Sequence, residues 1–127
     1  MTKKILVIDD DEAIRKSFLL AFEDSEYLIE TASSGEQGIE KHREHSFDLI
    51  FLDLKMPGIN GAETLMRLRR IDKEVPIYFI TAFYTEYFEE LRNAEKDGIA
   101  FEVLRKPIDA NQILMVTEGM LKGPVSY

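Results

Sequence analysis

The sequence lacks cysteine, which excludes a disulfide framework, a thiol nucleophile and any cysteine-ligated zinc or iron–sulfur site. It also lacks a long apolar run. The first apolar stretch, Ile5–Ile8, ends at three aspartates and is too short for a secretory leader or a membrane span. We therefore expect a cytoplasmic protein without a membrane segment.

Positive charge is scarce as well, with 16 lysine and arginine residues against 24 aspartate and glutamate residues and a net charge of −8. Direct binding of nucleic acid through its phosphates is not expected from such a chain. The sequence contains no Gly-x-x-x-x-Gly-Lys-Ser/Thr loop for a nucleotide, no internal repeat and no linker rich in proline, glycine or serine. At 127 residues, of which 45% are hydrophobic, it has the size and the core material of one domain.

Short apolar runs alternate with amphipathic segments of helical length. Strands are predicted at Ile5–Ile8, Tyr27–Ala32, Phe47–Leu54, Pro76–Thr81 and Phe101–Leu104. Helices are predicted at about Glu12–Glu23, from the Ser33–Glu36 cap to about His45, and at about Ala62–Ile71, Glu86–Asp97 and Asp109–Leu121. This alternation predicts an α/β fold, a parallel sheet with helices on both faces. The functional site of such a sheet lies beyond the carboxyl ends of its strands.

Polar side chains stand at the ends of four predicted strands. They are Asp9, Asp10 and Asp11 after the first strand, Asp53 in the third, Thr81 in the fourth and Lys106 after the fifth. Each alone could be a turn former or a helix cap. If these strands are neighbours, however, the residues meet at one patch. Two carboxylates about 4 Å apart repel by roughly 4 kcal/mol at an effective dielectric near 20. Such a cluster must protonate, spread apart or hold a cation, and all-oxygen ligands suit Mg²⁺ or another hard cation.

Four segments together resemble, in this order, the receiver domain of two-component response regulators. They are Ile5–Arg15 (ILVIDDDEAIR), Leu52–Gly61 (LDLKMPGING), Ile80–Ala82 (ITA) and Lys106–Pro107, and the similarity runs from Lys4 to about Lys122. The resemblance implies a flavodoxin-like fold, a doubly wound five-stranded parallel sheet of strand order 2-1-3-4-5 with five helices. It implies a receiver domain over residues 1–122, and a tail or the beginning of a linker at 123–127.

The resemblance also implies a role for each polar residue. Asp53 would be the phosphoacceptor, and Mg²⁺ would be bound by Asp10, Asp53 and the backbone carbonyl of Lys55, with Asp9 orienting the ion. Thr81 and Lys106 would contact the phosphoryl group, and the Lys106–Pro107 bond would be cis. Asp11 is expected to be an ordinary acidic residue of the following turn.

The function that this resemblance implies is a signalling switch. A histidine kinase or phosphotransfer protein would supply the phosphoryl group, and the chain would catalyse only its own phosphorylation and hydrolysis. One rival is a phosphatase or phosphotransferase that turns over small molecules, which usually needs a second acid two residues after the nucleophile. Lys55 stands there instead, and its side chain could reach the phosphoryl group or remain in solvent. Another is a receiver fold that never takes phosphate, which the complete residue set disfavours.

The chain departs from the pattern of receivers between Thr81 and Lys106, which lie an unusually long 25 positions apart. Receivers usually carry an aromatic residue three positions before the lysine, where this chain has Val103. Phe101 lies on the same strand face and could substitute through a bulge. If Phe101 does not substitute, the chain lacks the switch of receivers in which this aromatic residue rotates inward when the threonine moves.

The surface of residues 83–88 and 101–113 is expected to contact an output domain, a partner protein or a second copy of the chain. Within it, Phe83 is expected to hinder an attacking water. His42 and His45 are interpreted as solvated helix residues, remote from the site.

Overall fold

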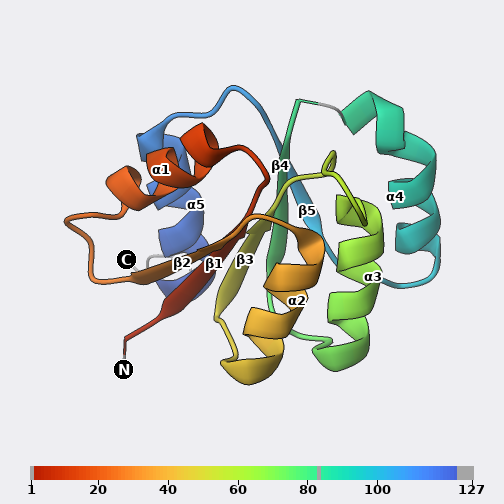
Figure 1. Cartoon of the computed structure of the whole chain (residues 1–127), viewed down its shortest axis with the longest axis horizontal. Helices are drawn as coiled ribbons and strands as arrows, with labels where there is room; N and C mark the ends of the chain where they lie inside the picture. The colour runs from red at the N-terminus through yellow and green to blue at the C-terminus, as the bar shows by residue number, and fades with distance from the viewer. Residues whose placement is uncertain (1, 83, 123–127) are drawn as a thin grey trace, which may run out of the picture.

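The computed structural model describes residues 2–82 and 84–122, which form an α/β fold around one sheet (Figure 1). Its strands are β1 (Lys4–Ile8), β2 (Leu28–Ala32), β3 (Leu49–Leu52), β4 (Ile77–Thr81) and β5 (Glu102–Arg105). They lie in the order β2-β1-β3-β4-β5, and every neighbouring pair is parallel. The predicted fold class and strand order are therefore confirmed.

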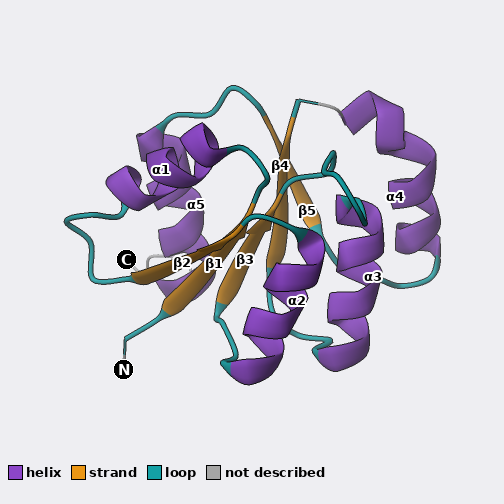
Figure 2. Cartoon of the chain, in the orientation of Figure 1, coloured by secondary structure: helices purple, strands orange, loops and turns teal. Residues whose placement is uncertain are grey.

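Helices cover both faces of the sheet (Figure 2). They are α1 (Glu12–Ala21), α2 (Gly35–Glu44), α3 (Gly61–Ile71), α4 (Phe88–Lys96) and α5 (Ala110–Lys122). α1 and α5 pack together on one face, and α2, α3 and α4 line the other. The helix expected from about Glu86 begins differently, because Tyr84–Tyr87 form a 3₁₀ turn, η1, before α4. None of the described helices has the length and apolar character that a membrane crossing requires.

β1 and β3 lie in the interior of the sheet, and their apolar side chains are buried on both faces. Ile5 and Val7 of β1 pack toward α1 and α5, whereas Leu6 and Ile8 pack toward α2, α3 and α4. All four residues of β3 are buried as well. Each such side chain contributes about 1.5–3 kcal/mol on leaving water. The carboxyl ends of β1 and β3 are thus firmly positioned at the carboxyl edge of the sheet.

Capping side chains begin three helices at this same edge. Asp11 accepts from the N–H of Ala13 at the start of α1, Ser34 from Gln37 at the start of α2, and Asn60 from Glu63 at the start of α3. Caps of this kind satisfy N–H groups that have no partner within the helix. The connections that follow β1, β2 and β3 therefore turn at defined residues.

His42 is buried, so its interpretation as a solvated helix residue is wrong. It follows Ile39 by three positions, which places both on the face of α2 that packs against the core. Its Nδ1 accepts from the N–H of Phe47 at 3.1 Å, and its Nε2 therefore donates to Oδ2 of Asp72 at 3.0 Å. A histidine with both ring nitrogens satisfied can replace an apolar residue. His45 is exposed, as expected.

Candidate functional site

Asp53 is the first residue after β3, and only 6% of its surface is exposed. Its backbone N–H donates to the carbonyl of Ile8 at 2.9 Å, which ties the end of β3 to the end of β1. Its Oδ1 accepts from the N–H of Leu54 at 3.0 Å. The carboxylate is therefore oriented by backbone groups at the carboxyl edge of the sheet.

Gly61 brings the first turn of α3 directly against the backbone of this residue. Its N–H donates to the carbonyl of Leu54 at 2.7 Å. A Cβ at position 61 would overlap the carbonyl oxygen of Asp53 and lie 2.7 Å from Cα of Leu54. Backbone cannot yield to such a contact as a flexible side chain can, so this close approach requires glycine.

Asp9 is the second buried carboxylate, with 3% of its surface exposed. Its N–H donates to the carbonyl of Ala32 at 3.0 Å, and its Oδ1 accepts from the N–H of Asp11 at 2.9 Å. Nη1 of Arg15 donates to its carbonyl oxygen at 2.8 Å. Asp10 is exposed, and Asp11 caps α1 as expected of a turn residue.

Lys106 brings a cation from the end of β5 to both buried carboxylates. Its Nζ lies 3.4 Å from Oδ2 of Asp9 and 3.8 Å from Oδ1 of Asp53. Its backbone N–H donates to the carbonyl of Thr81 at 2.9 Å, which joins the ends of β4 and β5. Thr81 is fully buried, and the Lys106–Pro107 peptide bond is cis, as predicted.

Burial controls the protonation of this cluster. Burial, together with the neighbouring charge of Asp9, raises the pKa of Asp53 to about 6, against the opposing effect of the Lys106 charge. Burial also raises the pKa of Asp9, against the hydrogen bond from Asp11 and the charge of Lys106. One ammonium faces three carboxylates in this cluster, so its negative charge is only partly balanced.

The residues fit a hard divalent cation. Carboxylate oxygens of Asp9, Asp10 and Asp53 lie within 4.8 Å of one another. A set of carboxylate oxygens suits Mg²⁺, which takes oxygen ligands and is commonly bound through one or two carboxylates plus water. The structure thus brings the three predicted aspartates together, while the assignment of the Lys55 carbonyl as a ligand stays a prediction.

The β4 and β5 side of the site differs from the expected pattern of receivers. β4 and β5 pair without interruption from Tyr78 and Glu102 to Thr81 and Arg105, so β5 contains no bulge. Val103 pairs with Phe79, whose ring also meets Phe101 edge-on at 5.5 Å. Phe101 therefore does not take the place of Val103, although both pack against the same core cluster, as period-two alternation predicts.

The segment before α4 faces the loop after β3. Nζ of Lys55 lies 3.8 Å from Oε2 of Glu86 in η1. Tyr87 is half-buried against the core, and Phe88 is 43% exposed. Phe83, expected to hinder an attacking water, lies outside the described residues.

Some contributors to the site could not be found from residue types. The N–H groups of Leu54 and Asp11 orient the two buried carboxylates, and Gly61 packs beneath one of them. Backbone donors leave no trace in a sequence. Gly61 ends the Leu52–Gly61 segment that resembles receivers, but its close approach to the backbone of Asp53 and Leu54 is visible only in the fold.

Comparison with known proteins agrees with this geometry. The family model of the response regulator receiver domain matches residues 5–118. The transcriptional regulatory protein AfsQ1 of Streptomyces coelicolor is 44% identical over 78 residues, which are 61% of this chain and 34% of that protein. The response regulator ArlR of Staphylococcus saprophyticus is 32% identical over 119 residues, 94% of this chain and 52% of that protein. The chain thus matches a third to a half of the length of these relatives.

Solved structures show the same fold. The chemotaxis protein CheY4 of Vibrio cholerae superimposes with a TM-score of 0.82 at 27% identity, covering 95% of this chain and all of that one. A CheY-like receiver domain protein from Methanospirillum hungatei gives a TM-score of 0.84 at 24% identity, covering 97% of each chain.

Proposed function

The chain belongs to the response regulator receiver domains of two-component systems, and we propose that its Asp53 accepts a phosphoryl group from the phosphohistidine of a histidine kinase or phosphotransfer protein. One observation carries the proposal. The buried Asp53 carboxylate lies within reach of the Lys106 ammonium, in an oxygen cluster suited to Mg²⁺, at the carboxyl edge of the sheet.

Asp53 acts as the nucleophile. With a pKa of about 6, its side chain is ionised at neutral pH. Oδ1 is engaged by the N–H of Leu54, so we assign the attack to Oδ2. A bond forms between this oxygen and phosphorus while the bond from phosphorus to the donor imidazole breaks. The imidazole leaves with that electron pair, and the product is an acyl phosphate.

The other residues stabilise the charge of the transferring group. The Lys106 ammonium moves from its pairing with the two carboxylates toward the phosphoryl oxygens, and the Thr81 hydroxyl donates to one of them. Asp9, Asp10, Asp53 and the carbonyl of Lys55 would hold Mg²⁺, which when bound neutralises charge on the phosphoryl oxygens. Hydrolysis of the acyl phosphate by water would end the signal. The chain would thus catalyse only its own phosphorylation and dephosphorylation.

An apolar groove next to Lys106 offers a docking place for the donor. It has a volume of about 430 Å³ and is lined by Phe18 of α1, Ile80 of β4, Pro107 and Ile113 of α5, among others. A donor protein seated there would bring its histidine to the carboxyl edge in the cytoplasm. We propose that the surface of residues 84–88 and 101–113 passes the signal on by contacting an output domain, a partner protein or a second copy of the chain.

The residue range of the domain is part of the proposal. We place the receiver at residues 1–122, four residues beyond the end of the family match, and regard 123–127 as a tail or linker that lies outside the described residues. The relatives are longer proteins, so regulation of an attached output domain is one route of signalling and binding to a separate protein is the other.

Incubation with acetyl phosphate and Mg²⁺, followed by intact-mass measurement, tests the proposal. We expect the parent chain to gain one phosphoryl group and Asp53→Asn to gain none. Asp97→Asn, an identical change at an exposed residue after α4, should be modified like the parent. An unmodified parent, or equal modification of Asp53→Asn, would contradict the assignment.

A further inference from the structure

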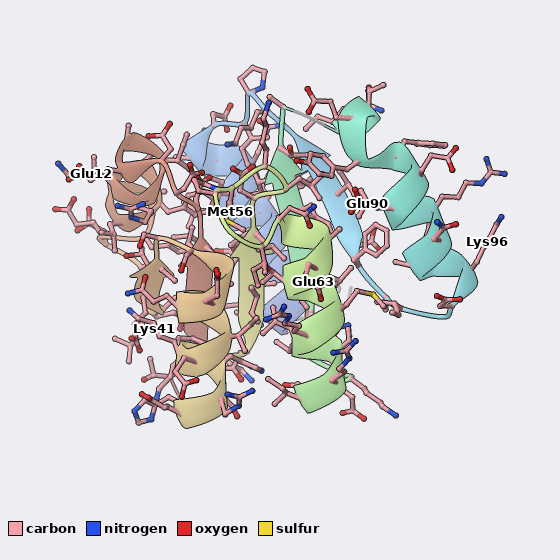
Figure 3. All side chains as sticks on the ribbon, turned by 45° about the vertical axis from the view of Figure 1, so that its right-hand side comes forward. Glu12, Lys41, Met56, Glu63, Glu90 and Lys96 are labelled. Atoms are coloured by element: carbon pink, nitrogen blue, oxygen red, sulfur yellow. The ribbon has the colours of Figure 1, made fainter. Side chains whose placement is uncertain are left out.

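An ion pair joins the loop after β3 to the turn before α4. Lys55 is two residues past Asp53, and its Nζ lies 3.8 Å from Oε2 of Glu86, with about half of each side chain exposed. A second link is close by, because Nδ2 of Asn60 donates to Oε2 of Glu90 at 3.5 Å. Figure 3 shows Glu90 on the first turn of α4, on the side toward the loop that carries Met56. The segment of residues 84–90 is therefore held to this loop at two points.

Negative charge is concentrated in the same segment. Glu86, Glu89 and Glu90 lie within five consecutive residues, and Lys55 pairs with the first of them from the loop after β3. Tyr87 packs half-buried against the core between them. Burial raises the pKa of Tyr87, as do, in decreasing order, the carboxylates of Glu86, Glu90 and Asp53. The charge of Asp53 thus already acts on Tyr87 within this segment.

The Lys55–Glu86 pair is suited to exchange. A half-exposed ion pair at this distance is worth little, because water screens the charges and two flexible side chains must be held in one geometry. A phosphoryl group carries a charge of about −1.5 to −2 and three acceptor oxygens, whereas the Glu86 carboxylate carries a single charge. Lys55 lies on the same loop as the acceptor, two residues after it. Its side chain can therefore turn from the Glu86 carboxylate to the more highly charged phosphoryl group.

On the premise that Asp53 is phosphorylated as proposed above, we propose that Lys55 exchanges Glu86 for the phosphoryl group and thereby releases the Tyr84–Tyr87 turn. Glu86 then loses the contact that ties η1 to the loop after β3, so η1 and the start of α4 loosen. The modification is thus read out through the segment before α4. In β5, Phe101 and Val103 are already packed on Phe79 and the core.

Amide hydrogen exchange of the peptide spanning residues 84–90 tests this coupling. The parent is measured before and after treatment with acetyl phosphate and Mg²⁺, and intact mass gives the phosphorylated fraction of the same sample. We expect phosphorylation to raise exchange in this peptide about two- to five-fold, the range set by the strength of an exposed pair. Glu86→Gln should reach that level without phosphate and respond little to it.

Glu89→Gln is the matched control, since it removes the same charge three residues further along. It should exchange like the parent before treatment and still respond to phosphorylation. Full phosphorylation of the parent without faster exchange in residues 84–90 would overturn the exchange mechanism and leave the proposed function standing. Equal acceleration in Glu89→Gln and Glu86→Gln would also overturn it, as a general effect of charge. A parent that gains no mass would overturn both proposals.

Discussion

The carboxyl edge of the sheet has two unlike halves. At the ends of β1 and β3, Asp9 and Asp53 are almost fully buried, and backbone N–H groups hold one oxygen of each carboxylate. On the side of α4, Lys55 and Glu86 meet through half-exposed side chains at 3.8 Å. The first half is fixed by main-chain hydrogen bonds and packing, and the second by contacts that water can replace.

This difference separates chemistry from signalling. A nucleophile must be held in one geometry and away from competing water, which burial and backbone donors achieve. A signalling surface must change its state for a small energy, which weak and exposed pairs allow. Substitutions in the buried half should therefore change the phosphorylation rate or the stability strongly, and substitutions in the exposed half should change them little.

The largest effect is expected from Lys106→Ala. It removes the ammonium that faces both buried carboxylates and would stabilise the transferring phosphoryl group. Loss of one preorganised electrostatic contact commonly costs about 10²–10³ in rate. The rate of phosphorylation by acetyl phosphate, followed by intact mass, should fall by this order, whereas the exposed Lys96→Ala should match the parent. A rate within two-fold of the parent would remove Lys106 from the mechanism.

A stability measurement on Asp53→Asn comes next. The pKa of Asp53 in the folded chain, about 6, lies above its ordinary value of 3.8. Between these pH values the folded state binds more protons than the unfolded state, so the stability of the parent falls as pH rises through this window. The loss amounts to about 3 kcal/mol and persists above it.

Asparagine carries no charge and avoids this loss. In metal-free buffer, the free energy of unfolding of Asp53→Asn should therefore exceed that of the parent by about 2–3 kcal/mol at pH 7.5 and by little near pH 4. Urea denaturation at both pH values measures the difference, with Asp97→Asn as the control. A variant less stable than the parent at pH 7.5 would show that the buried charge does not oppose folding.

Gly61→Ala should perturb both stability and chemistry. The added methyl group would overlap the backbone of Asp53 and Leu54, so the start of α3 must shift. Overpacking of this kind costs about 1–3 kcal/mol. Gly119→Ala in α5 meets nothing within 4 Å and should stabilise the helix by about 0.5–1 kcal/mol. Equal changes in unfolding free energy for both variants would refute the close approach at Gly61.

The smallest effect is expected from His42→Gln at the opposite edge of the sheet. Glutamine can still donate to Asp72 but does not replace Nδ1, which accepts from the buried N–H of Phe47. One unsatisfied buried donor costs about 1 kcal/mol or somewhat more. Urea denaturation should show this loss while the phosphorylation rate stays unchanged, and the exposed His45→Gln should alter neither. A slower phosphorylation in His42→Gln would mean that the two edges are coupled.

The sequence was sufficient for the fold and for the gathering of the site residues. Apolar runs of strand length alternating with amphipathic helices predict a parallel sheet, and the strand ends then bring Asp9, Asp10, Asp53, Thr81 and Lys106 to one edge. The parallel sheet rests on periodicity, which a sequence records directly, whereas the strand order that places these residues together was implied by the resemblance to receivers.

Other features depend on tertiary contacts between segments far apart in the sequence. His42 carries a polar ring in a helix, and only the positions of Phe47 and Asp72 make its burial favourable. The Lys55–Glu86 pair joins the loop after β3 to η1, a 3₁₀ turn that stands where the helix predicted from about Glu86 was to begin. The pairing of β5 with β4 is unbroken, which rules out the bulge considered for Phe101. This pairing depends on the register between the two strands, which the sequence does not specify.

The position of the acyl phosphate tests the central claim most directly. Borohydride reduces an acyl phosphate of aspartate to homoserine, which peptide mass spectrometry can locate after treatment with acetyl phosphate and Mg²⁺. We predict homoserine at position 53 alone, in proportion to the phosphorylated fraction found by intact mass. Homoserine at position 9 or 10, or its absence from a phosphorylated sample, would contradict the assignment of Asp53 as the acceptor.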